Sequence, residues 1–210
     1  MPTITASQYR RLSSAIIAAS LWLVGLAGQA DGAPCTQLLQ EGCTPTPMEG
    51  EITATARMQA CNDTLAPVGI AYLSERPSAD GVKQVDVMLR VWGGILPGSH
   101  AVHIHETANC RPCSAAGGHF DPGPHSNSNP DGNHPFHSGD LVNIQIAPSG
   151  RGLLSTVTTR ISLSGGPLSL FDEDGSAFIV HTQPDSYCND GPVAGCAGGA
   201  RAACGVIVRD

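Results

Sequence analysis

Histidine is concentrated in one stretch of this 210-residue chain, in a pattern suited to metal binding. Seven of the eight histidines lie between Ser99 and Asp140, and the eighth is His181. Alternate residues of a strand point to the same face, so His103 and His105 can bind one ion together. Imidazole nitrogen suits copper and zinc, and an all-nitrogen ligand set is one that Cu(II) favours. The spacing therefore predicts a metal site.

The N-terminal segment has the organisation of a secretory signal peptide. Arg10 and Arg11 precede an apolar stretch that is short for a membrane span, and small residues around Ala30 provide a cleavage site. The chain contains no other candidate span, so we expect an exported protein, periplasmic or extracellular, that has no membrane partner. We assign residues 1–30 to the signal peptide, 31–49 to an irregular segment and 50–210 to the functional domain.

Cysteine usage and charge agree with export and restrict the partners. All eight cysteines follow the predicted signal peptide, and an even number in an oxidising compartment favours disulfides. The chain has 11 basic and 18 acidic side chains, and cleavage removes two arginines, which leaves 9 against 18 and a net charge of −9. Nucleic-acid binding needs clustered lysine and arginine, so we expect no nucleic-acid partner. An anionic substrate would need local positive charge from a metal and a well-placed arginine.

The remaining sequence predicts an all-β domain. It is rich in turn residues, with 25 glycines and 16 prolines, and has no convincing amphipathic helix. Two long segments, 106–138 and 182–200, are predicted loops that together contain four histidines and four cysteines, and such loops are usually functional or held by disulfides. Alternation of apolar and polar residues predicts strands near 52–58, 68–73, 85–91, 101–105, 140–147, 152–164, 176–181 and 203–208.

Five motifs carry a resemblance to a known family. They are GSHAVHIHE at 98–106, CSAAGGHFDP at 113–122, HSGDL at 137–141, FIVH at 178–181 and GARAACGVI at 199–207. In this order they resemble the secreted copper/zinc superoxide dismutases, and the resemblance covers about residues 50–208. It implies an eight-stranded Greek-key β-barrel, an immunoglobulin-like sandwich with two long functional loops. It also implies an enzyme that converts superoxide to dioxygen and hydrogen peroxide with one copper and one zinc per subunit.

The resemblance implies a ligand set for each metal. His119 is expected to bridge the two ions as an imidazolate. The fourth zinc ligand of the family falls near Ser128, which is not a histidine, so His125 and His134 both remain candidates. If neither binds, the protein is effectively copper-only. The implied copper ligands are His103, His105, His119 and His181, and the implied zinc ligands are His119, His137, Asp140 and either His125 or His134.

Further roles follow from the same resemblance. His119 is expected to couple electron transfer to a proton, and Arg201 to guide the anion to copper. Asp185 is expected to join the copper and zinc ligands by hydrogen bonds, and His100 to have a structural role near the copper strand. A Cys113–Cys204 disulfide is implied. The other six cysteines allow fifteen pairings, among which Cys188–Cys196 and Cys35–Cys43 would close short loops.

Two other functions share most of these features. A copper-only dismutase would bind no zinc, although Asp185 argues for an intact zinc site. A non-enzymatic copper-binding module could use the same barrel, because a fold alone does not give a function, but it would have no need of Arg201. The loop at 182–200 lacks the lysine and threonine that often line the substrate channel in the family. The oligomeric state stays open, with a homodimer as one form.

Overall fold

The computed structural model describes residues 50–76, 80–123 and 126–210. The predicted signal peptide, the predicted irregular segment through residue 49, the Cys35–Cys43 pair and His125 lie outside the described residues. Within the described ranges the only helical segment is one 3-10 turn, η1 (Cys113–Ala116). No helix of these ranges is long and apolar enough to cross a membrane.

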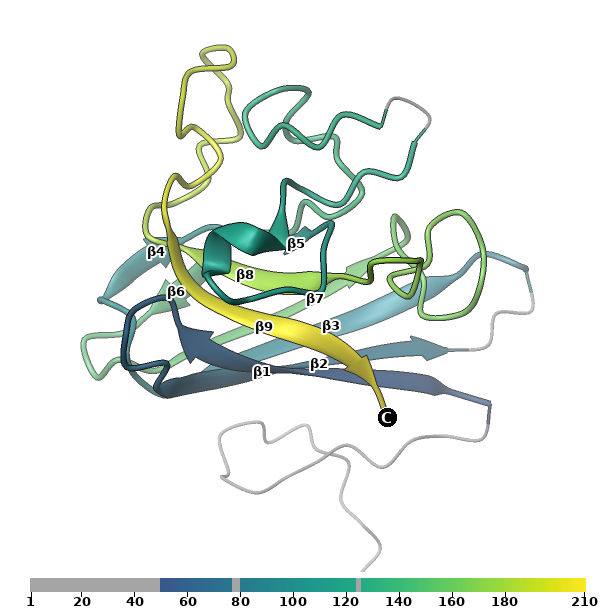
Figure 1. Ribbon diagram of the computed structural model, residues 1–210, viewed down its shortest axis with the longest axis horizontal. Helices are drawn as coiled ribbons and strands as arrows, with labels where there is room; N and C mark the ends of the chain where they lie inside the picture. Colours follow the sequence, from purple (N-terminus) through teal and green to yellow (C-terminus); the bar gives the residue numbers. More distant parts are fainter. Residues whose placement is uncertain (1–49, 77–79, 124–125) are drawn as a thin grey trace, which may run out of the picture. The chain divides into compact units, whose positions relative to one another are not determined.

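Nine antiparallel strands form a single sheet in the order β4-β6-β7-β3-β2-β1-β9-β8-β5 (Figure 1). Neighbours such as β1 with β9 and β3 with β7 are far apart in sequence, as crossover connections require. The strands are β1 (Ile52–Ala60), β2 (Pro67–Arg76), β3 (Gln84–Val91), β4 (Gly98–His100), β5 (Val102–His105), β6 (Ile144–Ile146), β7 (Gly152–Thr158), β8 (Ala177–His181) and β9 (Arg201–Arg209).

The two edge strands of the sheet, β4 and β5, are halves of one extended segment that is interrupted only at Ala101. One half pairs with β6 and the other with β8, so this segment joins the two ends of the sheet into a nearly closed barrel. Counted as one strand, it gives eight strand positions. The predicted all-β barrel is therefore confirmed.

The outer edge of β5 is covered by backbone from the long loop that follows it. The Ile104 N–H donates to Gly139 O at 2.9 Å, and Ile104 O accepts from Phe120 N–H at 2.9 Å. One residue before Ile104, Val102 O accepts from Leu141 N–H at 3.3 Å. These bonds hold two stretches of the loop against the strand that carries two of the histidines.

Residue alternation explains the barrel core and the unusual burial of β8. In β3, Val85, Val87 and Leu89 point into the core while the intervening residues are partly exposed. All five residues of β8 are buried, because this strand is covered on both faces. One face joins the barrel core, and the other packs with Cys204 and Ala116 beneath η1. β8 is therefore a rigid support for His181 at its end.

Two strands are shorter than the alternation predicts, and side chains that bond the backbone account for both differences. Thr158 ends β7, because its Oγ1 accepts from Arg160 N–H at 3.2 Å. Beyond it, Glu75 accepts from Leu163 N–H at 2.5 Å and Ser164 N–H at 2.9 Å, so a carboxylate replaces a neighbouring strand. Only Ile144–Ile146 of the predicted 140–147 strand forms β6, because residues 139–141 bond to β5 instead.

The implied Cys113–Cys204 disulfide is wrong. The structure pairs Cys61 with Cys113 and Cys110 with Cys204. The end of β1 lies beside β9, where Gln59 pairs with Cys204, so Cys61 and Cys204 both face the turn that carries the other two cysteines. The resemblance gave no weight to Cys61 as a competitor for Cys113. The Cys188–Cys196 pairing is confirmed.

Candidate metal centre

Buried histidines and one carboxylate form two adjoining groups of metal-ligating atoms beside β5 and β8. In each group the candidate ligand atoms lie within 4.8 Å of one another, and His103 and His119 belong to both. Isolated backbone bridges connect His103 to Asp140 and His105 to His119, which brings the loop ligands to the strand. The four-histidine cluster is His103, His105, His119 and His181, and the carboxylate cluster is His103, His119, His134 and Asp140.

The four-histidine cluster presents unprotonated nitrogens to a common point. His105 Nδ1 lies 3.0 Å from Gly117 O, and His181 Nδ1 lies 2.9 Å from Gly199 O. A carbonyl only accepts, so each Nδ1 carries the proton and each Nε2 has a free lone pair. These two Nε2 atoms are 3.4 Å apart, and His181 Nε2 is 3.1 Å from His103 Nδ1. Lone pairs that face one another at this distance repel unless a cation lies between them, so this arrangement suits a metal ion.

His119 faces both clusters, with one ring nitrogen toward each. Its Nδ1 lies 2.7 Å from Asp140 Oδ1, and its buried Nε2 has no hydrogen-bond partner. The His119 ring centroid is 4.1 Å from that of His103, within the four-histidine cluster. An imidazole that offers one nitrogen to each of two sites has the geometry of a bridging ligand.

Asp140 is the centre of the carboxylate cluster. Its oxygens lie 2.7 Å from His119 Nδ1, 3.0 Å from His137 Nδ1 and 3.1 Å from His134 Nδ1. His137 Nε2 is buried without a hydrogen-bond partner, and the buried His134 Nδ1 has Asp140 as its charged neighbour. Three imidazoles around one carboxylate are a ligand set that zinc accepts. Of the two candidates left open by the sequence, the structure places His134 here.

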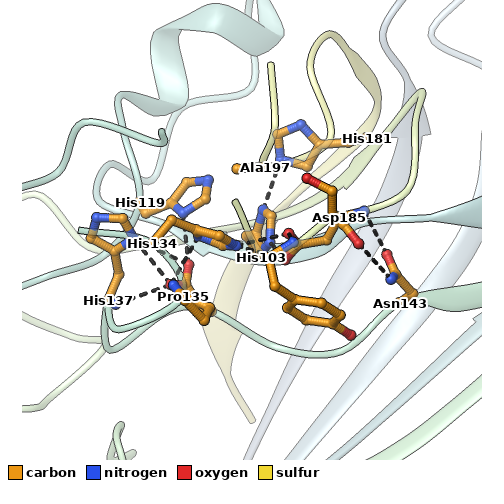
Figure 2. Close-up of polar contacts among 12 residues, drawn as sticks. His103, His119, His134, Pro135, His137, Asn143, His181, Asp185 and Ala197 are labelled. Carbon is orange, nitrogen blue, oxygen red and sulfur yellow. Dashed lines mark hydrogen bonds and ion pairs between the residues drawn. The ribbon is translucent and has the colours of Figure 1, made fainter. Parts of the chain in front are cut away.

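Asp185 links the two clusters from the second long loop (Figure 2). Its Oδ2 lies 3.1 Å from His103 Nε2, and both of its oxygens lie 2.8 Å from His134 Nε2. The Asp185 backbone is held by Asn143, which accepts from its N–H at 2.8 Å and donates to its carbonyl at 3.0 Å. Asn143 was missed by sequence reasoning, and its spacing three residues after Asp140 was the available signal.

Burial and charge shift the titration of these groups in opposite directions. Burial lowers the pKa of His119 to about 4 and that of His181 to about 3. Burial also lowers the pKa of His134, but hydrogen bonds to Asp140 and Asp185 outweigh it and raise the pKa to about 9. Burial alone would raise the pKa of Asp140, yet its three histidine neighbours hold it far below the ordinary range. His119 and His181 are thus neutral at pH 7, and the carboxylate cluster contains a stable anion.

These shifts predict that the metal-free protein is most stable near pH 6.5. Below about pH 6.5, His119 and His181 bind protons in the unfolded chain but remain unprotonated in the folded chain. The free energy of unfolding therefore falls as the pH is lowered toward 4. The stabilisation from His134 is complete below about pH 6.5 and is lost as the pH rises through about 9. Urea unfolding of chelator-treated protein between pH 4 and 10 measures this profile. A flat profile across that interval would contradict the histidine assignments.

Arg201, the first residue of β9, is fixed near the four-histidine cluster. Its guanidinium donates to Cys113 O and Gly117 O, and the latter carbonyl is the one that His105 Nδ1 contacts. After burial, the Arg201 charge is among the causes that lower the pKa of His105 and His181. An arginine held in this way keeps positive charge beside the four-histidine cluster.

His100 and a third group of candidate ligands complete the inventory of predicted residues. His100 contacts His181 O through Nδ1 at 2.9 Å and Leu96 O through Nε2 at 2.8 Å, and it lies outside both clusters. Asp131 groups with Cys188 and Cys196, but their disulfide removes both thiolates as ligands. Asp131 instead accepts from the N–H groups of Gly195 at 2.8 Å and Ala197 at 3.2 Å, which ties the two long loops together.

Arg160 is a further contact to the loop that sequence reasoning missed. Its guanidinium donates to Pro135 O at 3.1 Å and to Asp140 O, on either side of His137. We expect Arg160→Ala to weaken zinc binding about tenfold, the lower end of the effect of removing an outer contact, and to leave copper binding unchanged. Competition with a zinc-selective chelator measures the effect. Arg57→Ala, which removes an exposed arginine of β1, is the matched control, and equal losses in both variants would refute the specific role of Arg160.

Comparison with known proteins agrees with this geometry. The family model described as copper/zinc superoxide dismutase matches residues 68–207. The superoxide dismutase [Cu-Zn] of Deinococcus radiodurans is 35% identical over 167 residues, which cover 73% of this chain and 84% of the relative. The corresponding protein of Caulobacter vibrioides is 40% identical over 121 residues, which cover 54% of this chain and 66% of the relative.

A solved structure is also similar. The crystal structure of a SOD-like protein from Bacillus subtilis superposes with a TM-score of 0.56 at 29% sequence identity, over 73% of this chain and 97% of that chain.

Proposed function

Because this chain belongs to the copper/zinc superoxide dismutase family, we propose that it dismutates superoxide at the two adjoining clusters. The observation that carries the proposal is the orientation of His119, whose unpartnered Nε2 faces three lone-pair nitrogens while its Nδ1 faces Asp140. Copper fits the four-histidine cluster, and zinc fits the carboxylate cluster with His137 beside it.

The residues of the chain supply positioning, charge and a proton site. Copper held by His103, His105, His119 and His181 would supply reversible one-electron transfer, by which one superoxide is oxidised to dioxygen and a second is reduced to hydrogen peroxide. His119 Nε2 has no competing protein partner, so it is the atom at which a proton can be held near the product. Asp140 and Asp185 fix the orientation of the rings around it.

Arg201 accounts for the recognition of a small anion by an acidic protein. The full chain carries a formal charge of −7, which repels superoxide at long range. The Arg201 guanidinium is fixed beside the four-histidine cluster and offers charge-assisted hydrogen bonds to an oxygen anion. Superoxide is the only partner that we propose.

Metal content and turnover test the proposal together. The purified chain is reconstituted with both ions, its copper and zinc are counted by mass spectrometry, and superoxide decay is followed after a pulse of radiolysis. One copper and one zinc per chain with rapid decay support the proposal. Activity with copper alone would identify a copper-only dismutase, and bound copper without activity would leave a metal-binding module.

Export is part of the proposal. Three disulfides link cysteines of the described residues, and disulfides persist in oxidising compartments. We place the mature protein in a periplasm or outside the cell after removal of residues 1–30. Sequencing of the mature N-terminus tests this assignment, and a mature chain that retains Arg10 and Arg11 would overturn it.

A further inference from the structure

A surface cavity of about 370 Å³ lies where two of the disulfides meet, and neither metal cluster uses it. Three of the four cysteines in these disulfides line it. The turn Cys110-Arg-Pro-Cys113 forms one wall, so each cysteine of a Cys-x-x-Cys segment is bonded to a different strand region. The lining residues are Cys61, Asn62, Asp63, Leu65, Cys110, Arg111, Pro112 and Cys113.

The two disulfides differ in access. Cys61 and Cys113 are both half-buried and both line the cavity. Cys204 is 1% exposed and packs with Ala177 and Ile179 beneath η1, so the Cys110–Cys204 bond has only one cysteine at the cavity. A reagent that enters the cavity therefore meets both ends of the Cys61–Cys113 bond.

The cavity also carries a free positive charge. Arg111 is exposed, and its guanidinium makes no hydrogen bond or ion pair with any residue of the described ranges. Asp63 lines the same cavity but forms no ion pair with Arg111. A nearby arginine stabilises thiolate, which is both the attacking and the leaving species in disulfide exchange. Arg111 lies between Cys110 and Cys113 in this turn, and Cys113 belongs to the bond that has both ends at the cavity. A thiolate that leaves from Cys113 therefore forms beside a positive charge.

We propose that this cavity is a thiol–disulfide exchange site at which an external dithiol opens the Cys61–Cys113 bond. A thiolate of the dithiol attacks Cys61 Sγ, the Cys61–Cys113 bond breaks, and Cys113 leaves as a thiolate. The second thiolate of the reagent then attacks its own sulfur in the mixed disulfide and releases Cys61. The reagent is oxidised to a disulfide, and the protein gains the two electrons as two thiolates, which take up protons from water.

Opening this bond has a defined consequence for the proposed active site, and this step rests on the proposed function. Cys113 O is one of the two carbonyls that hold the Arg201 guanidinium. The Cys61–Cys113 bond fixes Cys113 to the end of β1, and after exchange the Cys110–Cys204 bond is the one disulfide left at this turn. The opened protein keeps its histidine clusters but holds Arg201 less firmly. We expect it to bind azide, a small anion probe, more weakly while retaining copper.

Thiol mapping tests the exchange step without reference to activity. The metal-loaded full chain is treated with dithiothreitol or glutathione, quenched with iodoacetamide and mapped by peptide mass spectrometry. Dithiothreitol should label Cys61 and Cys113 before Cys110 and Cys204, and glutathione should be found on Cys61. Labelling of Cys110 and Cys204 first, or together with the other pair, would overturn the proposal.

Two variants separate the charge effect from general accessibility. Arg111→Gln should slow opening of Cys61–Cys113 about threefold, the change expected for a rise of about one unit in the leaving thiol pKa. Cys188–Cys196 is an internal reference that should open at an unchanged rate in this variant. Equal rates at Cys61–Cys113 in both proteins would remove Arg111 from the proposal.

A double replacement, Cys61→Ser with Cys113→Ser, imitates the opened state. It should retain copper and show weaker azide binding, with an activity loss below the roughly 100-fold expected when an anion donor is removed outright. Unchanged azide affinity would overturn the link to Arg201. If the native chain proves inactive but the mapping succeeds, the exchange site stands and the proposed function fails.

Discussion

Replacing Arg201 by alanine is expected to lower the rate of superoxide decay at least tenfold (an order-of-magnitude figure) while one copper and one zinc stay bound. The Arg201 guanidinium donates to the carbonyls of Cys113 and Gly117, and Arg201 supplies no ligand atom to either metal cluster. Its loss therefore removes positive charge from the approach to the four-histidine cluster without removing a ligand. Pulse radiolysis with metal analysis of the same sample measures both quantities.

Charge and geometry can be separated at this position. Arg201→Lys keeps the positive charge but not the paired hydrogen bonds of a guanidinium to two carbonyls, because an ammonium group is a compact charge on a flexible stem. We expect an intermediate rate that falls more steeply with added salt than that of the parent protein. An Arg201→Ala variant with the full rate would show that superoxide reaches the site without this side chain.

The second large effect is expected for His134→Ala, which should weaken zinc binding more than about 100-fold and leave copper bound. His134 contacts Asp140 through one ring nitrogen and Asp185 through the other, so its removal takes a ligand from one cluster and a fixed partner from Asp185. Chelator competition measures zinc affinity, and absorbance of the copper form checks the remaining site.

His125→Ala is the matched control for this experiment. His125 is the other candidate that the sequence leaves open, and it differs from His134 by nine positions in the same loop. We expect its zinc affinity to equal that of the parent protein. If His125→Ala loses zinc and His134→Ala keeps it, the carboxylate cluster described above is not the zinc site.

The local sequence was sufficient to predict strands and residue pairs where side chains alternate between the two faces of a strand. The alternation in segments such as 85–91 identifies strands because one face of each meets the core. His103 and His105 were recognised as a pair for the same reason, since period two places them together on β5. The family resemblance then supplied His119, His181 and Asp140, which lie far apart in the sequence.

Contacts that depend on loop conformation could not be predicted from the sequence. Arg160 and Asn143 act through backbone carbonyls and N–H groups, which carry no residue signature. The choice between His125 and His134 depends on the path of a long loop, and spacing alone favoured neither. The predicted disulfide pairing was wrong because Cys61, just beyond the end of β1, lies near Cys204 on the neighbouring strand β9, and their proximity is a property of the folded sheet.

The covered edge of β5 connects metal binding to solubility. An unpaired strand edge is a template for association with another chain, and native proteins protect such edges. Here the protecting backbone at Phe120, Gly139 and Leu141 is adjacent to His119 and Asp140, the residues that meet at the carboxylate cluster. When ions hold these side chains in place, they also keep the strand edge closed. We therefore expect loss of the ions to loosen this backbone and to expose a β5 edge that can pair with other molecules, so that metal supply affects association of the chain as well as the proposed activity.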